Sequence, residues 1–321
     1  MKVVFLSGDP AEASARVRIH EHLDVLREQG LEPTVWTIPR SVPARLRAWR
    51  RLRDAEVVVL QRKLLDRVSL GALRRHAPRL VYDLDDALYT RPHGRPDGRQ
   101  RRRFARTLSQ VDLVLAGSEY LARAARERGG RRVAVWRPGV ALPAATATPE
   151  AEPVRVVWTG SAATLPYLEQ TAPLLRALQR RVPGWSLDVI ADAIPSLPGV
   201  TLRAHRWSPR VEDEVLSGAQ LGIYPLPDTP WARGKCAYKV LRYLAHGLAV
   251  LSVPQGGGAE VLGEPPAGRV AALDAWGDAL GELLRDPAAR RALGAAGREH
   301  ARRAHALAAR SAELAELLRR L

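Results

Sequence analysis

The chain has 321 residues, of which 46% are hydrophobic and 26% charged, a balance typical of a folded protein that excludes a disordered one. Its apolar runs, such as 57–60 and 248–251, are far shorter than the ~20 residues that cross a bilayer, and its start lacks the features of a secretory signal, so we expect a cytoplasmic protein. The net charge of +16 favours anionic partners, and the one cysteine excludes a disulfide framework or a multi-cysteine metal site within one chain.

The first half alternates short apolar runs with helical patterns. An apolar run at 2–6 ends at Ser7, a helical pattern follows up to Gly30, and a second apolar run occupies 34–38. Four further runs are continuous and apolar, as strands buried in a parallel sheet require; they lie at 55–60, 79–82, 111–115 and 131–135.

The same plan starts again at residue 154. A run at 154–158 leads into Thr159-Gly160-Ser161, a helical pattern covers 165–182, and a strand is predicted at 187–190. Four more runs complete this half, at 200–202, 221–224, 249–253 and 269–271. Two such beginnings predict an α/β protein with two Rossmann-like doubly wound domains facing across a cleft.

Composition sets the domain boundaries. We predict a first domain at 1–140, a linker at 141–153 that is rich in Pro, Ala and Thr, a second domain at 154–300 and a final helix at 301–321. The stretch 287–321 is nearly all Ala, Leu, Arg and Glu, which predicts two terminal helices with a solvated arginine face. One methionine, no asparagine and the preference for arginine over lysine are typical of a GC-rich, thermophilic source.

The segment RGKCAYKVLRYLAHGLAVLS, residues 233–252, is the strongest local signal. Two of the chain's four lysines, Lys235 and Lys239, are four residues apart there and would share one face at the start of a helix. Ammonium groups beside a helix N-terminus suit a diphosphate, and the alternative is two solvated lysines on a surface helix.

Glycines follow two strands of the second half. Gly160 and Ser161 come after the run at 154–158, and PQGGGAEVL places Gly256 and Gly257 before Glu260. Glycine permits positive φ and close approach of the backbone to an anion, although a flexible turn explains the second loop equally well. The sequence contains no P-loop motif, and no G-x-G-x-x-G follows its first strand.

Carboxylates end a strand of the first half in Tyr82-Asp83-Leu84-Asp85-Asp86. They could accept hydrogen bonds from sugar hydroxyls or act as a base, and we favour hydroxyl recognition over metal binding. Arg16 and Arg18 are predicted in the first turn of the first helix, where the dipole opposes cations, so an anionic partner would offset their cost; two surface arginines are the alternative.

Neither histidine nor cysteine chemistry is indicated. His20 and His22 are two residues apart on a helical pattern and point to different faces, so they are not a zinc pair. Cys236 has no histidine partner in the sequence and is interpreted as a small packing residue.

Five stretches together resemble glycosyltransferases of the GT-B fold and are similar to glycosyltransferase family 4. They are ASARVRIHEHLDVLREQG, LVYDLDDALY, DLVLAGSEYLA, VVWTGSAATLPYLE and IYPLPDTPWARGKCAYKVLRYLAHGLAVLSVPQGGGAEVL. The resemblance implies a nucleotide-sugar donor, such as a UDP-sugar, on the second domain, an acceptor on the first, and a last helix that packs back on the first domain. It also implies metal independence, because basic residues and a helix N-terminus neutralise the leaving diphosphate.

Two positions depart from the family pattern. Family members usually carry two glutamates where this chain has Gly234 and Arg242, and many have a histidine where it has Asp83 to Asp86. The second glutamate usually holds the donor ribose, so either the ribose is bound in another way or the donor site is altered.

We therefore predict a hexosyltransferase-type enzyme that moves a sugar from a nucleoside diphosphate sugar to a hydroxyl acceptor with retention, with no metal and no cofactor besides that co-substrate. The predicted catalytic residues are Lys235, Lys239, Asp85 and Asp86; the donor side is Gly160, Ser161, Gly256, Gly257 and Glu260; the acceptor side is Arg16, Arg18, Asp83 and Glu119. The acceptor is a glycan, a lipid-linked or a small molecule, and the charge could hold the protein peripherally on an anionic inner membrane face. The alternatives are a non-catalytic nucleotide-sugar-binding module of an envelope or polysaccharide assembly system and, less favoured, a nucleic-acid-binding protein, since no nucleic-acid motif occurs.

Overall fold

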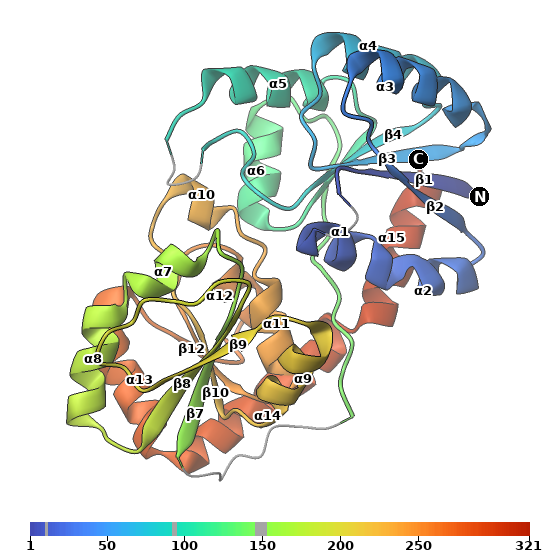
Figure 1. The fold of residues 1–321 in the computed structure, drawn as a ribbon. Helices are drawn as coiled ribbons and strands as arrows, with labels where there is room; N and C mark the ends of the chain where they lie inside the picture. The colour runs from blue at the N-terminus through green and yellow to red at the C-terminus, as the bar shows by residue number, and fades with distance from the viewer. Residues whose placement is uncertain (10–11, 92–94, 145–152) are drawn as a thin grey trace. The chain divides into compact units, whose positions relative to one another are not determined.

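The computed structural model describes residues 1–9, 12–91, 95–144 and 153–321, which divide into two compact units, each with a six-stranded parallel sheet (Figure 1). Unit 1 comprises Met1–Gly139, Thr229–Cys236 and Leu307–Leu321, and unit 2 comprises Val140–Asp228 and Ala237–Ala306. Of the predicted linker at 141–153, residues 145–152 lie outside the described part of the chain.

The sheet of unit 1 has the order β2-β1-β3-β4-β5-β6. Its strands are β1 (Lys2–Ser7), β2 (Glu32–Thr37), β3 (Val57–Gln61), β4 (Leu80–Leu84), β5 (Leu113–Ala116) and β6 (Val133–Val135). The chain moves from β1 to one side for β2 and then to the other side for β3. The point between β1 and β3, where the direction reverses, is where doubly wound sheets bind ligands.

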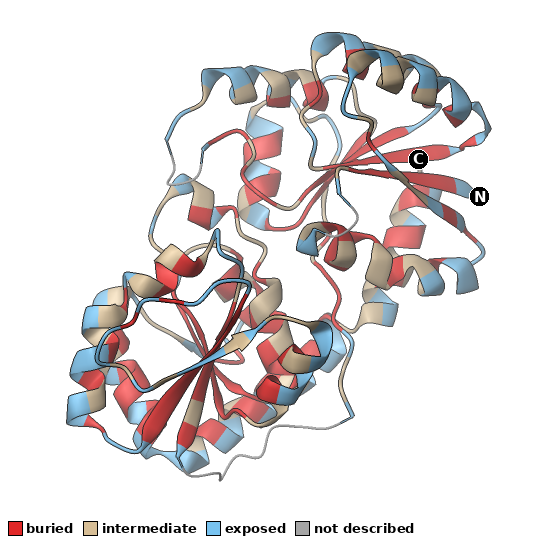
Figure 2. Cartoon of the chain, viewed as in Figure 1, coloured by how far each residue is buried: buried red, intermediate tan, exposed pale blue. Residues whose placement is uncertain are grey.

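Helices cover both faces of this sheet because its strand residues alternate between two cores. Val4 and Leu6 of β1 face one cluster, packed against α3, α4, α5 and α6, whereas Val3 and Phe5 face the other, packed against α2 and α15 (Figure 2). The helical elements of unit 1 are α1 (Ala13–Arg18), η1 (His20–His22), α2 (Leu23–Glu28), α3 (Val42–Trp49), η2 (Arg50–Asp54), α4 (Arg67–His76), α5 (Gly98–Leu108), α6 (Glu119–Glu127), α10 (Pro230–Arg233) and α15 (Leu307–Arg319).

The sheet of unit 2 has the order β12-β11-β10-β7-β8-β9. Its strands are β7 (Val154–Thr159), β8 (Trp185–Ala191), β9 (Leu202–Arg206), β10 (Leu221–Tyr224), β11 (Ala249–Ser252) and β12 (Arg269–Val270). Counted within the unit from β9, the order is third, second, first, fourth, fifth, sixth, which is the order of dinucleotide-binding Rossmann domains. Its switch point lies between β7 and β10.

The helices of unit 2 surround this sheet. They are α7 (Leu165–Glu169), α8 (Ala172–Arg181), α9 (Pro209–Ser217), α11 (Tyr238–Ala245), α12 (Gly257–Leu262), η4 (Leu273–Ala275), α13 (Trp276–Arg285) and α14 (Pro287–Ala304). Helix α11 buries five of its eight residues, including Val240, Leu241 and Tyr243. In both units, side-chain oxygens that accept from backbone N–H groups begin many of the helices, as Asp66 does for α4 and Ser208 for α9.

Two predicted helices are broken in the structure. The helix predicted before Gly30 is divided into α1, η1 and α2, with Ile19 in a non-helical conformation at φ −129°. The helix predicted at 165–182 is divided into α7 and α8, because Pro173 lacks an N–H and its ring is tolerated only in a first turn. The strand predicted at 200–202 lies later, at Leu202–Arg206, because an exposed edge strand has no continuous apolar run.

Within the described residues, no helix combines the length and hydrophobicity that crossing a membrane demands.

A buried histidine joins the C-terminal helix to the N-terminal part of unit 1. His22 Nδ1 is 2.7 Å from the hydroxyl of Ser311 on α15, and this hydroxyl donates to the carbonyl of Leu307 at 2.7 Å. The hydroxyl therefore accepts from Nδ1–H, and the imidazole is neutral. Burial, followed by the nearby charge of Arg18, lowers the pKa of His22 to about 3.

This histidine makes the stability of the protein depend on pH. A histidine in the unfolded chain has a pKa of about 6.5, so below that pH the unfolded state takes up a proton that the folded state refuses. We expect the free energy of unfolding to fall by up to about 1.4 kcal/mol per pH unit between about pH 6.5 and pH 3. Urea unfolding at a series of pH values measures this slope. His22→Gln should flatten it, whereas Leu318→Ala, which removes packing of α15 without a titrating group, should lower stability equally at each pH; an unchanged slope in His22→Gln contradicts the prediction.

Candidate functional site

At the switch point of the unit 2 sheet, the residue that follows β7 has no room for a side chain. Gly160 follows β7, and a Cβ atom there would lie 2.1 Å from the ring of Trp158 and 2.6 Å from Nζ of Lys239. Trp158 is buried, so the ring cannot give way easily. Glycine at this position is therefore what allows Lys239 to lie against the end of β7.

Lys239 lies in the first turn of α11 and points to that strand end. Its Nζ donates to Oγ1 of Thr164 at 3.0 Å and lies 4.5 Å from the centre of the Trp158 ring. The first turn of α11 contains no acidic residue. An ammonium group next to the N-terminus of an eight-residue helix makes this corner favourable for an anion.

The predicted backbone donors at this corner are already used within the protein. Gly160 donates its N–H to the carbonyl of Ile190 at 2.9 Å, and Ser161 donates its N–H to Oγ1 of Thr164 at 3.2 Å. The expectation that Gly160 and Ser161 offer N–H groups to a ligand is therefore wrong in this structure. The N–H of Gly160 continues the hydrogen bonds between β7 and β8, and the N–H of Ser161 closes the turn before α7.

The second glycine loop lies at the start of α12. Gly256 has φ +75°, a conformation that glycine permits, and Gly257 is the first residue of α12. Glu260 is half-buried in the first turn of this helix. The loop follows β11, so it lies at the carboxyl edge of the same sheet.

Arg242 of α11 is held by acidic side chains of α9. Its Nε is 3.6 Å from Glu212, and its guanidinium also pairs with Asp213. Glu212 is buried and accepts a hydrogen bond from Oγ1 of Thr159 at 2.9 Å. Burial would lower the pKa of Arg242, but Glu212 and other neighbours raise it, so the arginine remains charged. Glu212 had no signal in the sequence, because its partners are distant along the chain.

Lys235 does not share a helix with Lys239. Helix α10 ends at Arg233, Ala237 adopts a left-handed conformation with φ +55°, and α11 begins only at Tyr238. The prediction of a common helical face is therefore wrong, because an unpredicted left-handed residue separates the two lysines. Lys235 belongs to unit 1, where its Nζ lies 2.8 Å from Asp86 and 4.8 Å from the centre of the Trp231 ring.

Asp85 and Asp86 form a polar network at the end of β4. Asp86 pairs with Arg62 at 2.9 Å as well as with Lys235, and Asp85 accepts a hydrogen bond from Ser14 and lies 3.4 Å from Arg62. Burial raises the pKa of the Asp86 carboxyl, against the pull of Lys235. Within the described residues, no group of three or more His, Cys, Asp or Glu side chains could hold a metal ion.

Arg62 had no signal in the sequence and stands at the centre of this network. It adopts φ +58°, which is strained for a residue with a side chain, and it is held there by two hydrogen bonds. Its N–H donates to the carbonyl of Asp83 at 3.0 Å, and its carbonyl accepts from the hydroxyl of Tyr82 at 3.1 Å.

Arg18 and Asp83 are buried against each other and do not face an acceptor. They are 2% and 3% exposed and form an ion pair, and Arg18 also donates to the carbonyl of Trp136 at 2.8 Å and lies 4.1 Å from the centre of its ring. Burial alone would lower the pKa of Arg18, but the charge and hydrogen bonds of Asp83 raise it. The prediction that Arg18 and Asp83 face the acceptor is therefore wrong. The predicted place of the arginines in the first turn of the helix is also wrong: α1 ends at Arg18, so Arg16 and Arg18 lie in its last turn, where the helix dipole favours cations.

The two other predicted acceptor residues pair with neighbours. Arg16 lies 3.2 Å from Glu21, and Glu119, the first residue of α6, lies 3.9 Å from both Arg126 and Arg137.

Cys236 donates its thiol to the carbonyl of Asp85 at 3.0 Å, and burial raises the pKa of this thiol well above its usual range. A protonated, hydrogen-bonded thiol is the packing residue that the sequence suggested.

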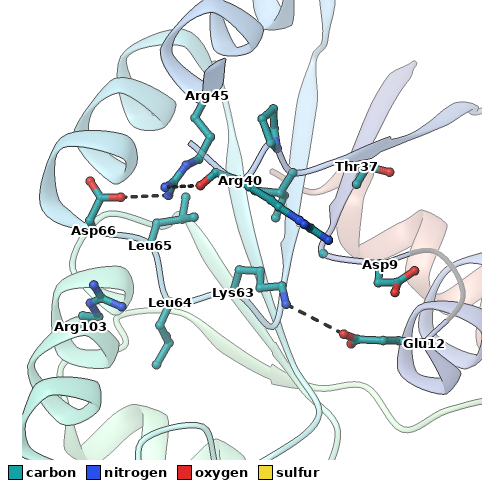
Figure 3. Close-up of a pocket in the computed structure, with 13 residues that line it drawn as sticks. Asp9, Glu12, Thr37, Arg40, Arg45, Lys63, Leu64, Leu65, Asp66 and Arg103 are labelled. Atoms are coloured by element: carbon teal, nitrogen blue, oxygen red, sulfur yellow. Dashed lines mark hydrogen bonds and ion pairs between the residues drawn. The ribbon is translucent and has the colours of Figure 1, made fainter. Parts of the chain in front are cut away.

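A cavity of about 630 Å³ opens at the carboxyl ends of β1, β2 and β3 in unit 1 (Figure 3). Its charged lining consists of four cations, Arg40, Arg45, Lys63 and Arg103, and three acids, Asp9, Glu12 and Asp66, none of which the sequence analysis selected. Lys63 is the second residue after β3, so the rule that ligands bind at the carboxyl ends of strands would have found it. Arg103 lies within α5, and only the folded chain brings it to this edge.

The sequence matches no protein-family model and no curated protein. In contrast, many solved structures share its fold. Sucrose-phosphate synthase from Thermosynechococcus elongatus is 14% identical with a TM-score of 0.79, covering 99% of this chain and 98% of that one. HepE from Anabaena, in complex with UDP and glucose, is 15% identical with a TM-score of 0.75, covering all of both chains. WaaG, a glycosyltransferase of lipopolysaccharide biosynthesis, is 14% identical with a TM-score of 0.73, covering 98% and 99%.

These neighbours define the fold class. They are GT-B glycosyltransferases, and this chain has their fold, with two Rossmann-like units built on parallel sheets. The fold class predicted from the sequence is therefore confirmed.

Replacing Asp83 tests the structural role of the buried ion pair. Asp83→Asn leaves the Arg18 guanidinium buried without a counter-charge, so we expect a loss of about 3–5 kcal/mol in the free energy of unfolding. Asp24→Asn is the matched control, because Asp24 pairs with Arg27 on an exposed helix surface, where such a pair contributes about 0–1 kcal/mol. Urea unfolding measures both, and equal effects of the two substitutions would show that the buried pair has no special role.

A second substitution tests the close packing at Gly160. Gly160→Ala places a methyl group against Trp158 and Lys239, so we expect a loss of about 1–3 kcal/mol in the free energy of unfolding. Gly71→Ala in α4 is the control: a methyl group added there would point into open space, and the variant should be neutral or gain up to about 1 kcal/mol. Thermal and urea unfolding compare the two variants. Wild-type stability in Gly160→Ala would mean that Lys239 and Trp158 are not held as the structure has them.

Proposed function

We propose that the protein transfers a sugar from a nucleoside diphosphate sugar to a hydroxyl acceptor, with the donor on unit 2 and the acceptor on unit 1. The observation that carries the proposal is Lys239, fixed against Gly160 at the switch point of a sheet with dinucleotide-binding strand order. An ammonium group at that point suits the diphosphate that leaves when the glycosidic bond breaks.

The known neighbours support the class of donor. HepE has been crystallised with UDP, with UDP and glucose, and with UDP-glucose, and WaaG is named a glycosyltransferase. Since the fold extends over the whole of this chain, we extend the same donor class to it and propose a UDP-sugar carrying a hexose.

Five features of unit 2 are assigned a role in donor binding. Lys239 and the N-terminus of α11 balance the charge of the leaving diphosphate, which makes the proposed route independent of a metal ion. Gly256 and Gly257 bring the backbone close to the donor, and Glu260 contacts its sugar or ribose. We propose that the reaction retains the anomeric configuration, as the family resemblance implies.

The acidic groups of unit 1 have a different task. Asp86 is bonded to Lys235 and Arg62, so it is not available to take a proton from an acceptor without breaking this network, and Asp85 accepts from Ser14 and lies 3.4 Å from Arg62. We assign Asp85, Asp86 and Lys235 the role of positioning residues that hold Thr229–Cys236 in unit 1.

Replacing Lys239 tests the assignment of the donor corner. Removing one group that stabilises charge in a transition state costs roughly 10²–10³ in turnover, so Lys239→Ala should lower UDP release from UDP-glucose by that factor if glucose is the transferred sugar. Lys2→Ala is the matched control, because Lys2 is exposed at the start of β1. The donor is first identified by thermal shift with a panel of nucleoside diphosphate sugars, where a ligand at a hundred times its Kd adds ~2.7 kcal/mol.

One observation favours the non-catalytic alternative. Arg242 stands where the family usually holds the donor ribose with a glutamate, and Glu212 and Asp213 already neutralise it. Tight binding of a nucleoside diphosphate sugar, with no release of the diphosphate under any acceptor condition, would assign the protein to that binding class and contradict the proposed transfer.

A further inference from the structure

The cavity of unit 1 occupies the point of the sheet where ligands bind in doubly wound folds. It is lined by Gly8 and Asp9 after β1, by residues 37–40 at the end of β2 and after it, and by residues 63–66 after β3. The sheet order reverses between β1 and β3, so the cavity lies at the switch point of unit 1. Its volume of about 630 Å³ is within the range of small-molecule sites.

Two arginines of this lining have no acidic partner. In the part of the chain that the structure describes, no carboxylate lies within ion-pair distance of the guanidinium of Arg40 or of Arg103. Arg40 follows β2 and Arg103 is on α5, so the two charges come from different elements (Figure 3). Charged groups of one sign, left unpaired around a concave surface, favour a ligand of the opposite sign.

Lys63 adds a third cation to the lining, and the glycine at position 8 makes room for its side chain. Its side chain crosses Gly8, where a Cβ atom would lie 1.9 Å from Cε and 2.4 Å from Nζ of the lysine. Its nearest carboxylate oxygen, on Glu12, is 4.0 Å away, at the outer limit for an ion pair. The absence of a side chain at Gly8 is what admits this ammonium group to the cavity.

Besides Asp9 and Glu12, the lining contains a further pair of charged residues, Arg45 and Asp66, which supports the loop that presents Arg40. Arg45 pairs with Asp66 at 2.9 Å and donates to the carbonyl of Arg40 at 3.1 Å (Figure 3). Asp66 also accepts from the N–H of Ser69 at 2.9 Å at the start of α4; burial would raise its pKa, but these bonds and Arg45 lower it. Arg45 and Asp66 therefore neutralise each other and are not available to a ligand.

We propose that this cavity binds an anionic group of the acceptor, a phosphate or a carboxylate, through Arg40, Arg103 and Lys63. The inference rests on the proposed function, because it names the chemical class of that enzyme's acceptor. Apolar atoms of Ile38, Leu64 and Leu65 line the same cavity and provide a surface for the carbon skeleton beside the charged group. The anion can belong to a free sugar phosphate or to a lipid headgroup, and the experiment separates these two sources.

The test compares a charged and a neutral sugar on matched variants. Glucose 6-phosphate, glucose and inorganic phosphate are titrated by calorimetry into the wild type, into Arg40→Gln/Arg103→Gln, and into Arg47→Gln/Arg75→Gln. The last variant removes the same charge from exposed arginines of α3 and α4 that do not line the cavity. Co-sedimentation with phosphatidylglycerol and with phosphatidylcholine vesicles provides the lipid arm.

The expected result is a loss specific to the cavity. The affinity for glucose 6-phosphate, or for phosphatidylglycerol vesicles if the anion is a headgroup, should fall about tenfold or more in Arg40→Gln/Arg103→Gln and little in the control, since hydrogen bonds to charged groups are strong. The binding of glucose and of phosphatidylcholine vesicles should be the same in the wild type and in both double variants. Equal losses in the two double variants, or no binding of either anionic probe to the wild type, would overturn the proposal.

Gly8→Ala gives a second, independent reading. It displaces the Lys63 amine without changing the charge, and because only the flexible end of that side chain must move, the fold should tolerate it. We expect weaker binding of the anionic probe with a thermal unfolding midpoint close to that of the wild type. Unchanged binding in Gly8→Ala would remove Lys63 from the proposed site.

UDP distinguishes a failure of this inference from a failure of the proposed function. Stabilisation by UDP should persist in Arg40→Gln/Arg103→Gln and be lost in Lys239→Ala, whereas binding of the anionic probe should show the opposite pattern. If UDP stabilises the wild type but neither anionic probe binds to it, only the acceptor class is overturned. Absence of any UDP stabilisation in the wild type overturns the donor assignment.

Discussion

A guanidinium sealed inside a protein needs a carboxylate, and in unit 1 Arg18 and Asp83 meet this need for each other. Arg18 ends α1 and Asp83 lies in β4, and Arg18 also contacts Trp136, whose Nε1 donates to the carbonyl of Arg310 on α15 at 2.9 Å. The N-terminal helix, the middle of the sheet and the C-terminal helix are thus tied through one buried charge. Because α1 ends at Arg18 and β4 contains Asp83, the pair joins the helix that follows the loop after β1 to the strand that precedes Asp85 and Asp86.

In both units, the cations at the switch point of the sheet have different surroundings from the cations elsewhere. Near β4, Arg62 and Lys235 are matched by Asp85 and Asp86, and in unit 2 Arg242 is matched by Glu212 and Asp213, so these charges support structure. At the two switch points the balance differs: Lys239 stands in a helix turn without acids, and Arg40 and Arg103 have no carboxylate near them among the described residues. A net charge of +16 is therefore less informative than the few places where cations and ligand-binding topology coincide.

Periodicity and apolar runs were sufficient for the architecture, because a buried parallel strand records its surroundings in its own residues. Every predicted run overlaps a strand, and Gly256 has the positive φ that its loop suggested. The site was harder to predict, since Ala237 gives no warning of a left-handed turn and Arg18 looks like a surface residue until Asp83, far along the chain, is placed beside it. The spacing of residues along the chain predicts which side chains share one face of a helix. It does not predict which side chains from distant segments meet at the edge of a sheet.

The segment Thr229–Cys236 and the helix α15 belong to unit 1, although unit 2 supplies the chain on one or both sides of them. Leu314, Ala315 and Leu318 fill the same core as Val3 and Phe5, so the first 139 residues do not hold a complete hydrophobic interior. Neither unit is a continuous stretch of sequence, and cutting the chain at the apparent boundary near residue 140 would separate the core of unit 1 from Thr229–Cys236 and α15. The first 139 residues therefore cannot be exchanged as an independent module, because their hydrophobic core is completed by the last helix of the chain.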